Sequence, residues 1–180
     1  MAIITLNNRA TNRSDTASAG QVFTATSATA ADFQAAGGGK LLQLVHGITT
    51  TTVTHVSNGG QVDTGLTATI TPTASNSKIL VLISQSNKVQ RGGSNSLDYD
   101  LRLFRGSSEV EKWSNVCSQE VQGSALYGSN HCYNYLDSPS STSQLVYKTT
   151  GAIVSSGGGR TVAFQNSSAP STMTLMEIGA

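Results

Sequence analysis

The sequence predicts an all-β protein: an antiparallel, jelly-roll-like β-sandwich of about eight to ten strands, preceded by an extended N-terminal arm. The first observation is the aliphatic run Ile79–Ile83, which has turn-prone residues on both sides and is of strand length rather than helix length. The second is that short alternating runs are separated by Gly, Ser, Asn and Pro turns. The third is composition, because Ser and Thr make up 47 of the 180 residues and suit solvated sheet faces.

The composition also excludes some partners. The formal net charge is +1, charged residues are 12% of the chain, and the basic residues are scattered. These values give no electrostatic reason to expect binding to nucleic acid. No stretch approaches the roughly 18 apolar residues of a membrane span, and no signal peptide is recognisable, so no membrane partner is expected. Cys117 and Cys132 could form a disulfide, but two such thiols more often stay reduced in a protein made in the cytoplasm.

Residues 1–39 are predicted to form an arm rather than a domain, because they hold few large apolar residues and cannot build a core. Ile3–Leu6 could pair as a short edge strand, Ser27–Ala36 is predicted to form one or two helical turns, and Gly37–Gly39 is a flexible hinge. We expect this arm to fold on a partner rather than back on its own domain. Its predicted contact residues are Ile3, Ile4, Leu6, Arg9, Arg13, Val22, Phe23 and Phe33.

Residues 40–180 are predicted to form the sandwich. Its first strands are Leu41–Val45, Thr50–Val56 and an alternating segment, Leu66–Ile70, that Pro72 ends. The central strand is the run Ile79–Ile83. Because apolar residues occupy both faces of this run, we expect the rest of the chain, including a second sheet, to cover it on both faces.

The second half of the domain continues the pattern. Between the polar loop Lys88–Ser96 and the irregular stretch Ser114–Asn130, a strand places Leu97, Tyr99, Leu101 and Leu103 on one face, and Glu109–Trp113 forms a short run. The remaining strands are predicted at Cys132–Leu136, Leu145–Lys148, Ala152–Val154, Thr161–Gln165 and Thr172–Ile178. So many short strands in one domain favour a jelly roll over an immunoglobulin-like sandwich, which is usually near 100 residues.

No catalytic, cofactor-binding or metal-binding residue is predicted, and the chain is not expected to be an enzyme. His46, His55 and Asp63 could meet if the first strands pair, but they lack metal-ligand spacing. Asp98 and Asp100 share a strand face with Arg102, which is typical of surface charge; Asp100 and Arg102 could pair there. No nucleophile elbow, phosphate loop or catalytic triad spacing occurs. Four aromatic residues could stack on a sugar, although ordinary packing is the favoured interpretation: Trp113, Tyr127, Tyr133 and Tyr135.

Several stretches of the domain, taken together, resemble a family of small virion proteins from tailed bacteriophages. They are Gly39–Val45, Asp63–Pro72, Ser77–Gln85, Leu101–Gly106, Tyr135–Pro139 and Thr174–Ala180. The resemblance implies a non-enzymatic β-sandwich, usually a homotrimer, on the surface of the particle. It implies no catalytic residues. Similar domains occur both as capsid decoration proteins and as the tips of tail or head fibres.

The short arm favours the first of these roles, because a fibre generally carries a long shaft between its anchor and its tip. We therefore expect a capsid decoration (cement) protein, made in the host cytoplasm, that binds the major capsid protein on the outer capsid surface through its arm. The alternative is a tail or head fibre or receptor-binding tip, in which the loops Lys88–Ser96 and Ser114–Asn130 would contact a host surface polysaccharide.

Overall fold

The computed structural model shows two compact units, Met1–Gly39 and Lys40–Ala180. It describes residues 3–6, 9–12, 21–25, 31–35, 39–56, 60–91, 97–119, 125–154 and 159–179. Every strand pair in these ranges is antiparallel.

The N-terminal unit contains two separate hairpins. Strand β1 (Ile3–Leu6) pairs with β2 (Arg9–Asn12), and β3 (Gln21–Ala25) pairs with β4 (Ala31–Ala35). The predicted helical turns over Ser27–Ala36 are therefore wrong for residues 31–35, and the rest of that segment lies outside the described residues. So short a helix is marginal on its own, whereas pairing with β3 gives alternate residues of β4 backbone hydrogen bonds.

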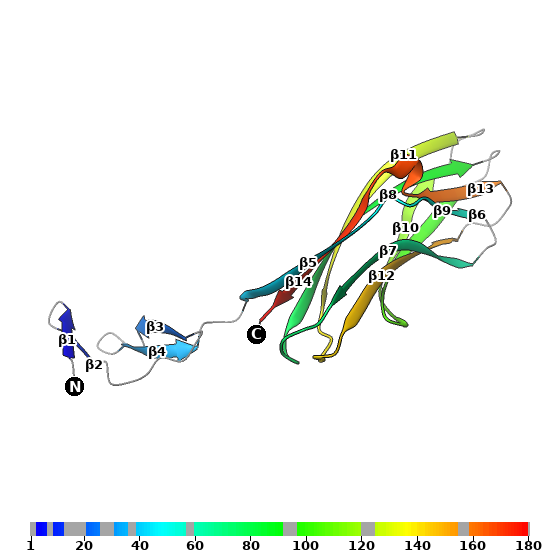
Figure 1. The fold of residues 1–180 in the computed structure, drawn as a ribbon. Coiled ribbons are helices and arrows are strands. Elements are labelled where there is room, and N and C mark those ends of the chain that lie inside the picture. Colours follow the sequence, from blue (N-terminus) through cyan, green and yellow to red (C-terminus); the bar gives the residue numbers. More distant parts are fainter. Residues whose placement is uncertain are drawn as a thin grey trace. The chain divides into compact units, whose positions relative to one another are not determined.

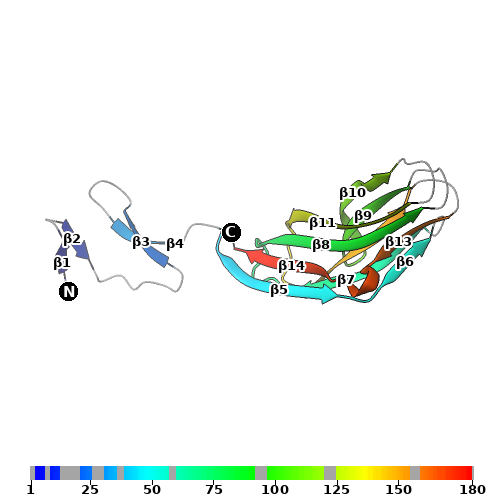
Figure 2. The same cartoon turned by 90° about the horizontal axis from the view of Figure 1, so that it is seen from above.

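The second unit is a sandwich of ten strands in two sheets (Figures 1 and 2). Sheet I has four strands in the order β10-β9-β12-β7, and sheet II has six, with β8 at its centre. The predicted all-β antiparallel sandwich is confirmed. The strands are β5 (Leu41–Thr49), β6 (Val53–Val56), β7 (Gln61–Ile70), β8 (Lys78–Arg91), β9 (Leu97–Arg105), β10 (Ser108–Gln119), β11 (Ala125–Asp137), β12 (Leu145–Ile153), β13 (Arg160–Phe164) and β14 (Ser171–Ile178).

The strand order is that of a jelly roll. In sheet II, β14 and β13 pair with successive halves of β8, and β5 and β6 pair with β14 and β13. Strands β5 and β6 thus act together as one interrupted strand, and so do β13 and β14. With each counted once, the eight strand positions follow the order 1-8-3-6 in sheet II and 5-4-7-2 in sheet I, which gives the crossed connections of a double Greek key.

Several strands are longer than the sequence predicts, among them β8, β10 and β11. β8 continues to Arg91, and β11 pairs with it along the whole length, from Ala125↔Arg91 to Asp137↔Ile79. β10 likewise extends to Gln119, so residues 88–91 of the predicted loop and residues 114–119 and 125–130 of the predicted irregular stretch are strand. The Ser, Asn and Lys residues in these segments have low strand propensity, but a neighbouring strand overrides it by satisfying their backbone groups.

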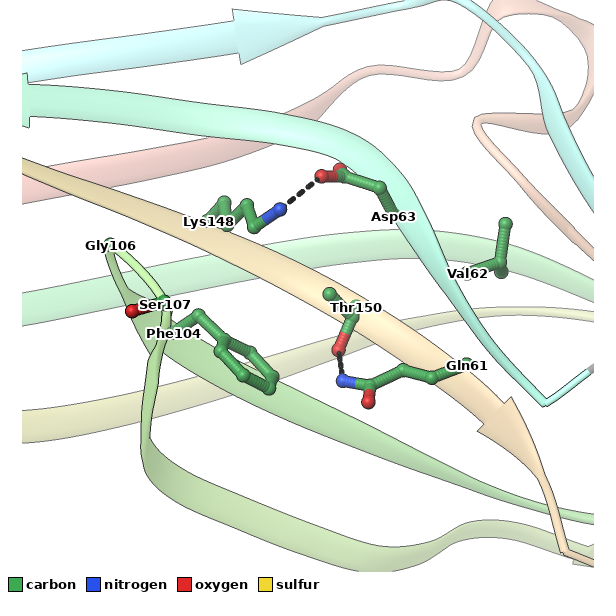
Figure 3. Close-up of a pocket in the computed structure, with 8 residues that line it drawn as sticks. All are labelled: Gln61, Val62, Asp63, Phe104, Gly106, Ser107, Lys148 and Thr150. Atoms are coloured by element: carbon green, nitrogen blue, oxygen red, sulfur yellow. Dashed lines mark hydrogen bonds and ion pairs between the residues drawn. The ribbon is translucent and has the colours of Figure 1, made fainter.

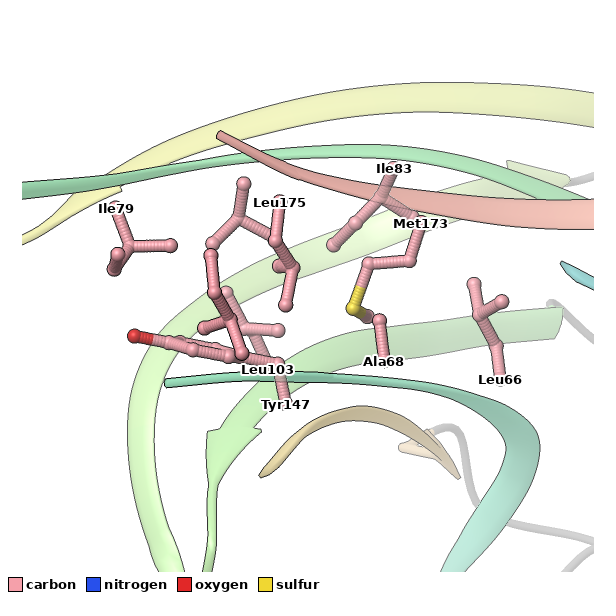
Figure 4. Close-up of a cluster of buried hydrophobic side chains, with 10 residues drawn as sticks. Leu66, Ala68, Ile79, Ile83, Leu103, Tyr147, Met173 and Leu175 are labelled. Atoms are coloured by element: carbon pink, nitrogen blue, oxygen red, sulfur yellow. The ribbon is translucent and has the colours of Figure 1, made fainter. Parts of the chain in front are cut away.

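The larger of two apolar clusters lies between the sheets (Figure 4). Met173 and Leu175 project from β14 toward Ala68, Leu103 and Tyr147 on the facing sheet. These side chains are nearly or fully buried, as the alternation in their strands predicts. The cluster comprises Leu66, Ala68, Ile70, Ile79, Val81, Ile83, Leu103, Tyr147, Met173 and Leu175.

A polar triad lies beside this cluster. The hydroxyl of Tyr147 donates to Asp137 Oδ2 at 2.6 Å, and Arg105 Nη1 lies 2.6 Å from the same oxygen. Burial and the neighbouring Asp137 carboxylate raise the pKa of the Tyr147 hydroxyl. The three groups come from β12, β11 and β9, so the triad connects both sheets, and it satisfies a buried carboxylate that would otherwise be costly.

The smaller apolar cluster is built around Phe164, which packs edge-on against Tyr99 with ring centroids 6.0 Å apart. Gly151 in the opposite sheet makes room for this ring. A Cβ added at Gly151 would lie 2.3 Å from Phe164 Cζ. Only a residue without a side chain allows the two sheets to approach this closely.

A buried hydrogen-bond network separates the two clusters. Thr149 Oγ1 donates to Gln85 Oε1 at 3.0 Å and lies 2.5 Å from Thr64 Oγ1, and Gln85 Nε2 donates to Ser171 Oγ at 3.0 Å. Gln165 completes it, because its amide can donate to the carbonyls of Thr51 and Thr64 and accept from Ser171 and Gln85, all within 3.0 Å. The network links both sheets and leaves no member unpaired.

Gln165 is also the residue that directly follows the end of β13. Its φ of 51° is left-handed, and it is followed by the short 3₁₀ turn Asn166–Ser168 before β14 begins. The neighbouring edge strand breaks at the same level, where Thr52 Oγ1 donates to the carbonyl of Gln165 at 2.8 Å. A left-handed non-glycine residue costs free energy, which the buried hydrogen bonds of Gln165 offset.

A carboxylate closes the sandwich where β5 begins. Glu177 is fully buried, and its oxygens accept from Gln43 Nε2 at 2.6 Å and from the backbone N–H and hydroxyl of Thr73 at 2.7 Å each. Burial alone would raise the pKa of this carboxyl, but the hydrogen bonds outweigh it and lower the pKa to about 2. Glu177 thus connects β14, β5 and the segment after β7.

We predict that Gly151→Ala lowers the free energy of unfolding by about 1–3 kcal/mol, because the new methyl group overlaps the ring of Phe164. Urea unfolding of the purified protein measures this. Gly128→Ala is the control, since a Cβ there would meet only one atom, at 4.0 Å, and should change stability by less than about 1 kcal/mol. Equal effects of the two substitutions would contradict the close approach at Gly151.

We predict that Glu177 makes stability depend on pH between its unfolded value of 4.5 and its folded pKa of about 2. Because the folded pKa is the lower one, the carboxylate stabilises the protein above pH 4.5, and this contribution is lost as the pH falls toward 2. The difference in unfolding free energy between wild type and Glu177→Gln should shrink over this range in urea titrations. A difference that stays constant would contradict the assignment.

Candidate functional site

The residues considered as metal ligands lie apart. His46 is on the outer face of sheet II, where its Nδ1 lies 3.0 Å from Thr174 Oγ1. His55 is buried in β6, and burial lowers its pKa, while Asp63 lies on sheet I with its Oδ2 2.9 Å from Lys148 Nζ. Within the described residues, no group of three or more His, Cys, Asp or Glu could hold a metal ion.

The predicted aromatic patch is mostly packing. Trp113 and Tyr133 stack on one another with ring centroids 4.5 Å apart, and together they bridge the edges β10 and β11 of the two sheets. Tyr135 is half-buried against the larger cluster, and Tyr127 is exposed. The stacked rings use a face on each other, so these four residues do not present a shared sugar platform. Cys117 and Cys132 are free thiols.

The predicted contact residues of the arm are distributed over its hairpins. Ile3, Ile4 and Leu6 lie in β1, Arg9 in β2, Val22 and Phe23 in β3, and Phe33 in β4, where it is the register partner of Phe23. Arg13 lies outside the described residues. The structure pairs β1 with β2, and the role of these residues in docking stays a prediction.

The outer face of sheet I is charged. Arg102 Nη1 lies 3.0 Å from Glu109 Oε2, and Lys112 Nζ lies 2.8 Å from Asp100 Oδ2. Arg102 also lies 3.7 Å from Asp100, as predicted, but Asp100 is only 2% exposed, which corrects its assignment as surface charge. The backbone N–H of Asn115, in an irregular part of β10, donates to Asp100 and helps to bury it.

A groove of about 280 Å³ lies on this charged face (Figure 3). The ring of Phe104 forms one side of the groove. The rest of the lining includes the Asp63–Lys148 ion pair and the hydrogen-bonded pair of Gln61 and Thr150. An aromatic face beside paired donors and acceptors is suited to a polar ligand with one apolar side. We name it the Phe104 groove. Its lining residues are Gln61, Val62, Asp63, Phe104, Gly106, Ser107, Lys148 and Thr150.

The outer face of sheet II is apolar instead. Strand register places four large side chains in one row across the sheet, which we name the apolar row: Leu44, Met176, Leu80 and Leu136. Leu44 is 56% exposed and Leu136 is 51% exposed. Around the row, Leu42, Ile48 and Leu82 are also exposed. The outward positions of this sheet carry no acidic residue in the described strands, and their only Lys or Arg residues are Lys78 and Lys88.

This face corrects the expectation that the central strand is covered on both sides. Ile79, Val81 and Ile83 are buried by sheet I, but Leu80 is only half-buried and Leu82 is 39% exposed. The described residues of the sandwich leave the second face of β8 uncovered. The signal was present in the sequence, since β5 and β14 also carry large apolar residues at the outward positions that a solvated strand would fill with polar ones.

A hollow of about 300 Å³ lies next to the apolar row on the same face. It forms because small side chains follow the leucines along β8 and its neighbours. We name it the Cys132 hollow, lined on the outer face by Leu82, Ser84, Cys132, Asn134, Thr172 and Thr174. Ile48, 62% exposed, stands at the β5 edge in the same row as Thr172, Ser84 and Cys132. The face therefore offers both a projecting apolar side chain and a recess.

Comparison with known proteins gives a limited likeness. No protein-family model matches the sequence, and no curated protein matches it. Among the described residues, no helix is long and apolar enough to cross a membrane.

The solved structures that resemble this chain include particles of infectious bursal disease virus. The Gx strain structure is 10% identical with a TM-score of 0.35, covering 86% of this chain and 43% of that chain. The VP2 subviral particle is 12% identical with a TM-score of 0.36, covering 86% and 43%. The derived T=1 particle is 12% identical with a TM-score of 0.36, covering 87% and 40%. The chain thus spans about two fifths of the length of these proteins, and a likeness this weak carries no inference about function.

Proposed function

We propose that this chain is a structural protein of a tailed-bacteriophage virion, a decoration (cement) protein on the outer capsid surface. In this role it is a homotrimer that binds the major capsid protein through its N-terminal unit and stabilises the shell. It is made in the host cytoplasm, and its action is mechanical rather than catalytic.

The observation that carries this proposal is the division of the chain at Gly39. The first 39 residues contain two two-stranded hairpins, and such hairpins are at best marginally stable by themselves in water. They gain stability by lying on another protein surface. In the sequence this unit is followed at once by β5 at Leu41, with no segment between them long enough for a shaft, which suits a protein that lies on a shell.

The phage family resemblance supports the same role. Each of the resembling stretches includes part of a strand of the sandwich, among them β8, β9 and β14. A protein that binds the assembled shell but not its separated subunits stabilises the shell by mass action. A clamp that bridges neighbouring capsid subunits would in this way resist the pressure of the packaged genome.

We predict that the protein is present on purified virions in a copy number comparable to that of the major capsid protein. Covering a shell requires many copies, whereas a fibre or tail tip requires few. Quantitative mass spectrometry of purified particles measures the ratio. A handful of copies per particle would contradict the decoration role and favour a fibre.

Deletion of residues 1–36 tests the attachment itself. The truncated chain should remain a folded, soluble sandwich, because the core clusters lie entirely in the second unit. It should fail to bind particles that lack the protein, while the full chain binds. Retained binding would contradict the role of the N-terminal unit.

The Phe104 groove favours a second candidate function, a receptor-binding tip that contacts host surface polysaccharide. The ring of Phe104 could stack on the apolar face of a pyranose, while Gln61, Asp63 and Lys148 hydrogen-bond its hydroxyls. This site differs from the loops that the sequence suggested for glycan contact.

If this second function holds, Phe104→Ala should weaken binding to a glycan-array hit by at least about tenfold, because truncation removes the stacking face. Val154→Ala, an exposed apolar position elsewhere in the sandwich, is the control and should bind like wild type. Absence of any array binding by the wild-type protein would count against the glycan role.

A further inference from the structure

The uncovered face of the central strand points to a partner surface. β8 is a core strand whose outward residues Leu80 and Leu82 are apolar, yet the described residues of the sandwich leave them open. We propose that copies of this chain associate through the outer face of sheet II, with Ile48 of one copy entering the Cys132 hollow of the next. This inference adds a contact surface to the homotrimer of the proposed function. It rests on that proposal only for the number of copies.

The contrast between the two outer faces indicates which one is an interface. Sheet I carries the ion pairs of Asp63, Asp100 and Glu109 with their basic partners, as solvated surfaces do. The described outward positions of sheet II carry mainly leucine, isoleucine, threonine and asparagine, with Lys78 and Lys88 as the only Lys or Arg residues. Depletion of charge together with large exposed apolar residues is characteristic of the centre of an interface.

The low charge of the outer face of sheet II also indicates that its partner is a second copy of this chain. A charged partner surface would bury unpaired charges against the apolar row, at a large free-energy cost. At its described strand positions, the outer face of sheet II is largely apolar and carries no acidic group, so a copy of it is compatible. Lys78 and Lys88 are the only Lys or Arg residues at its described outward positions, and both β8 positions lie away from the Cys132 hollow.

The shape of the face fits a contact in which the β5 side of one copy meets the β11 side of the next. Ile48 projects at the β5 edge, and the Cys132 hollow lies between β14, β8 and β11 in the same row. When two copies stand side by side with their strands parallel to the symmetry axis, rows at the same level meet. The projection of one copy then faces the recess of the next, a head-to-tail contact that closes into a ring if the rotation allows.

The area of the face is sufficient for a specific contact. β8 and β11 pair over 13 residues, which at about 3.3 Å each gives a length of roughly 43 Å. Four strand positions at about 4.8 Å give a width of roughly 19 Å. The flat face is therefore about 800 Å², and a copy in a closed ring divides it between its two neighbours. The total area that each copy could bury thus matches what one partner buries in a standard-size interface.

Cysteine cross-linking tests this contact, because native Cys132 is an exposed free thiol at one side of the face. Ile48→Cys adds a thiol at the other side. Within one chain the two positions are three strand spacings apart, about 14 Å, which is too far for a disulfide. Mild oxidation of Ile48→Cys should therefore give reducible covalent oligomers that end at the trimer.

Wild type and Val146→Cys are the matched controls. Val146 is 40% exposed on the outer face of sheet I, so its substitution adds an accessible thiol away from the proposed contact. Neither control should form a trimer. Equal ladders in Ile48→Cys and Val146→Cys, or no ladder in either, would overturn the proposed contact. A ladder in Ile48→Cys alone that ends at the dimer would support the face and contradict the trimer.

Sedimentation equilibrium gives an independent readout. Leu44→Glu and Leu136→Glu should each weaken association by at least about a hundredfold, since the interface would then bury unpaired carboxylates. Val146→Glu should sediment like wild type, and circular dichroism checks that every variant is folded. If neither leucine substitution weakens the trimer, the proposed contact through sheet II is wrong, but the proposed trimeric state stands. If the wild-type protein is monomeric at micromolar concentration, both the proposed contact and the trimer are wrong. The virion role would still be tested by the copy-number measurement.

Discussion

The hydrogen-bond network around Gln85 and Gln165 is the constraint on which the rest of the sandwich depends. It crosses the interior from Thr64 and Thr149 in sheet I to Ser171 in sheet II, and it divides the apolar core into two clusters. Buried polar groups must all find partners, and only one alignment of the two sheets provides them here. The level of the network therefore fixes where the two interrupted strands of sheet II can break. The same alignment of the two sheets brings Gly151 opposite Phe164.

Much of this fold could be predicted from local sequence. Alternation assigned the buried faces of β7 and β9 correctly, and the number and shortness of the strands indicated a jelly roll. What local patterns could not supply were interactions between distant residues. Nothing near Gln165, Glu177 or Asp100 in the sequence distinguishes a buried polar group from a solvated one, because their partners lie up to 134 residues away. The extended pairing of β8 with β11 was missed for the same reason.

The candidate surfaces were harder to predict than the fold. The sequence nominated residues of the N-terminal unit, whose role stays a prediction, and aromatic residues that turn out to stack on each other. It did not nominate the Phe104 groove, since Gln61, Asp63, Phe104 and Lys148 converge only through strand pairing. The apolar face was visible in principle, because β8 is apolar at both outward and inward positions. The wrong assumption was that one chain must cover both faces of such a strand.

One hydrogen bond gives the proposed assembly a direction. The backbone N–H of Gly179 donates to the carbonyl of Lys40 at 2.8 Å, so the sandwich begins and its last strand ends at the same place. If the copies stand with their strands along a common axis, every chain enters its sandwich at Lys40 at one end, and the paired residues Arg91 of β8 and Ala125 of β11 lie at the other. Such an oligomer has a distinct foot and head. Several weakly holding segments attached to one rigid foot act as a chelate, so firm anchorage would not need strong binding by any single segment.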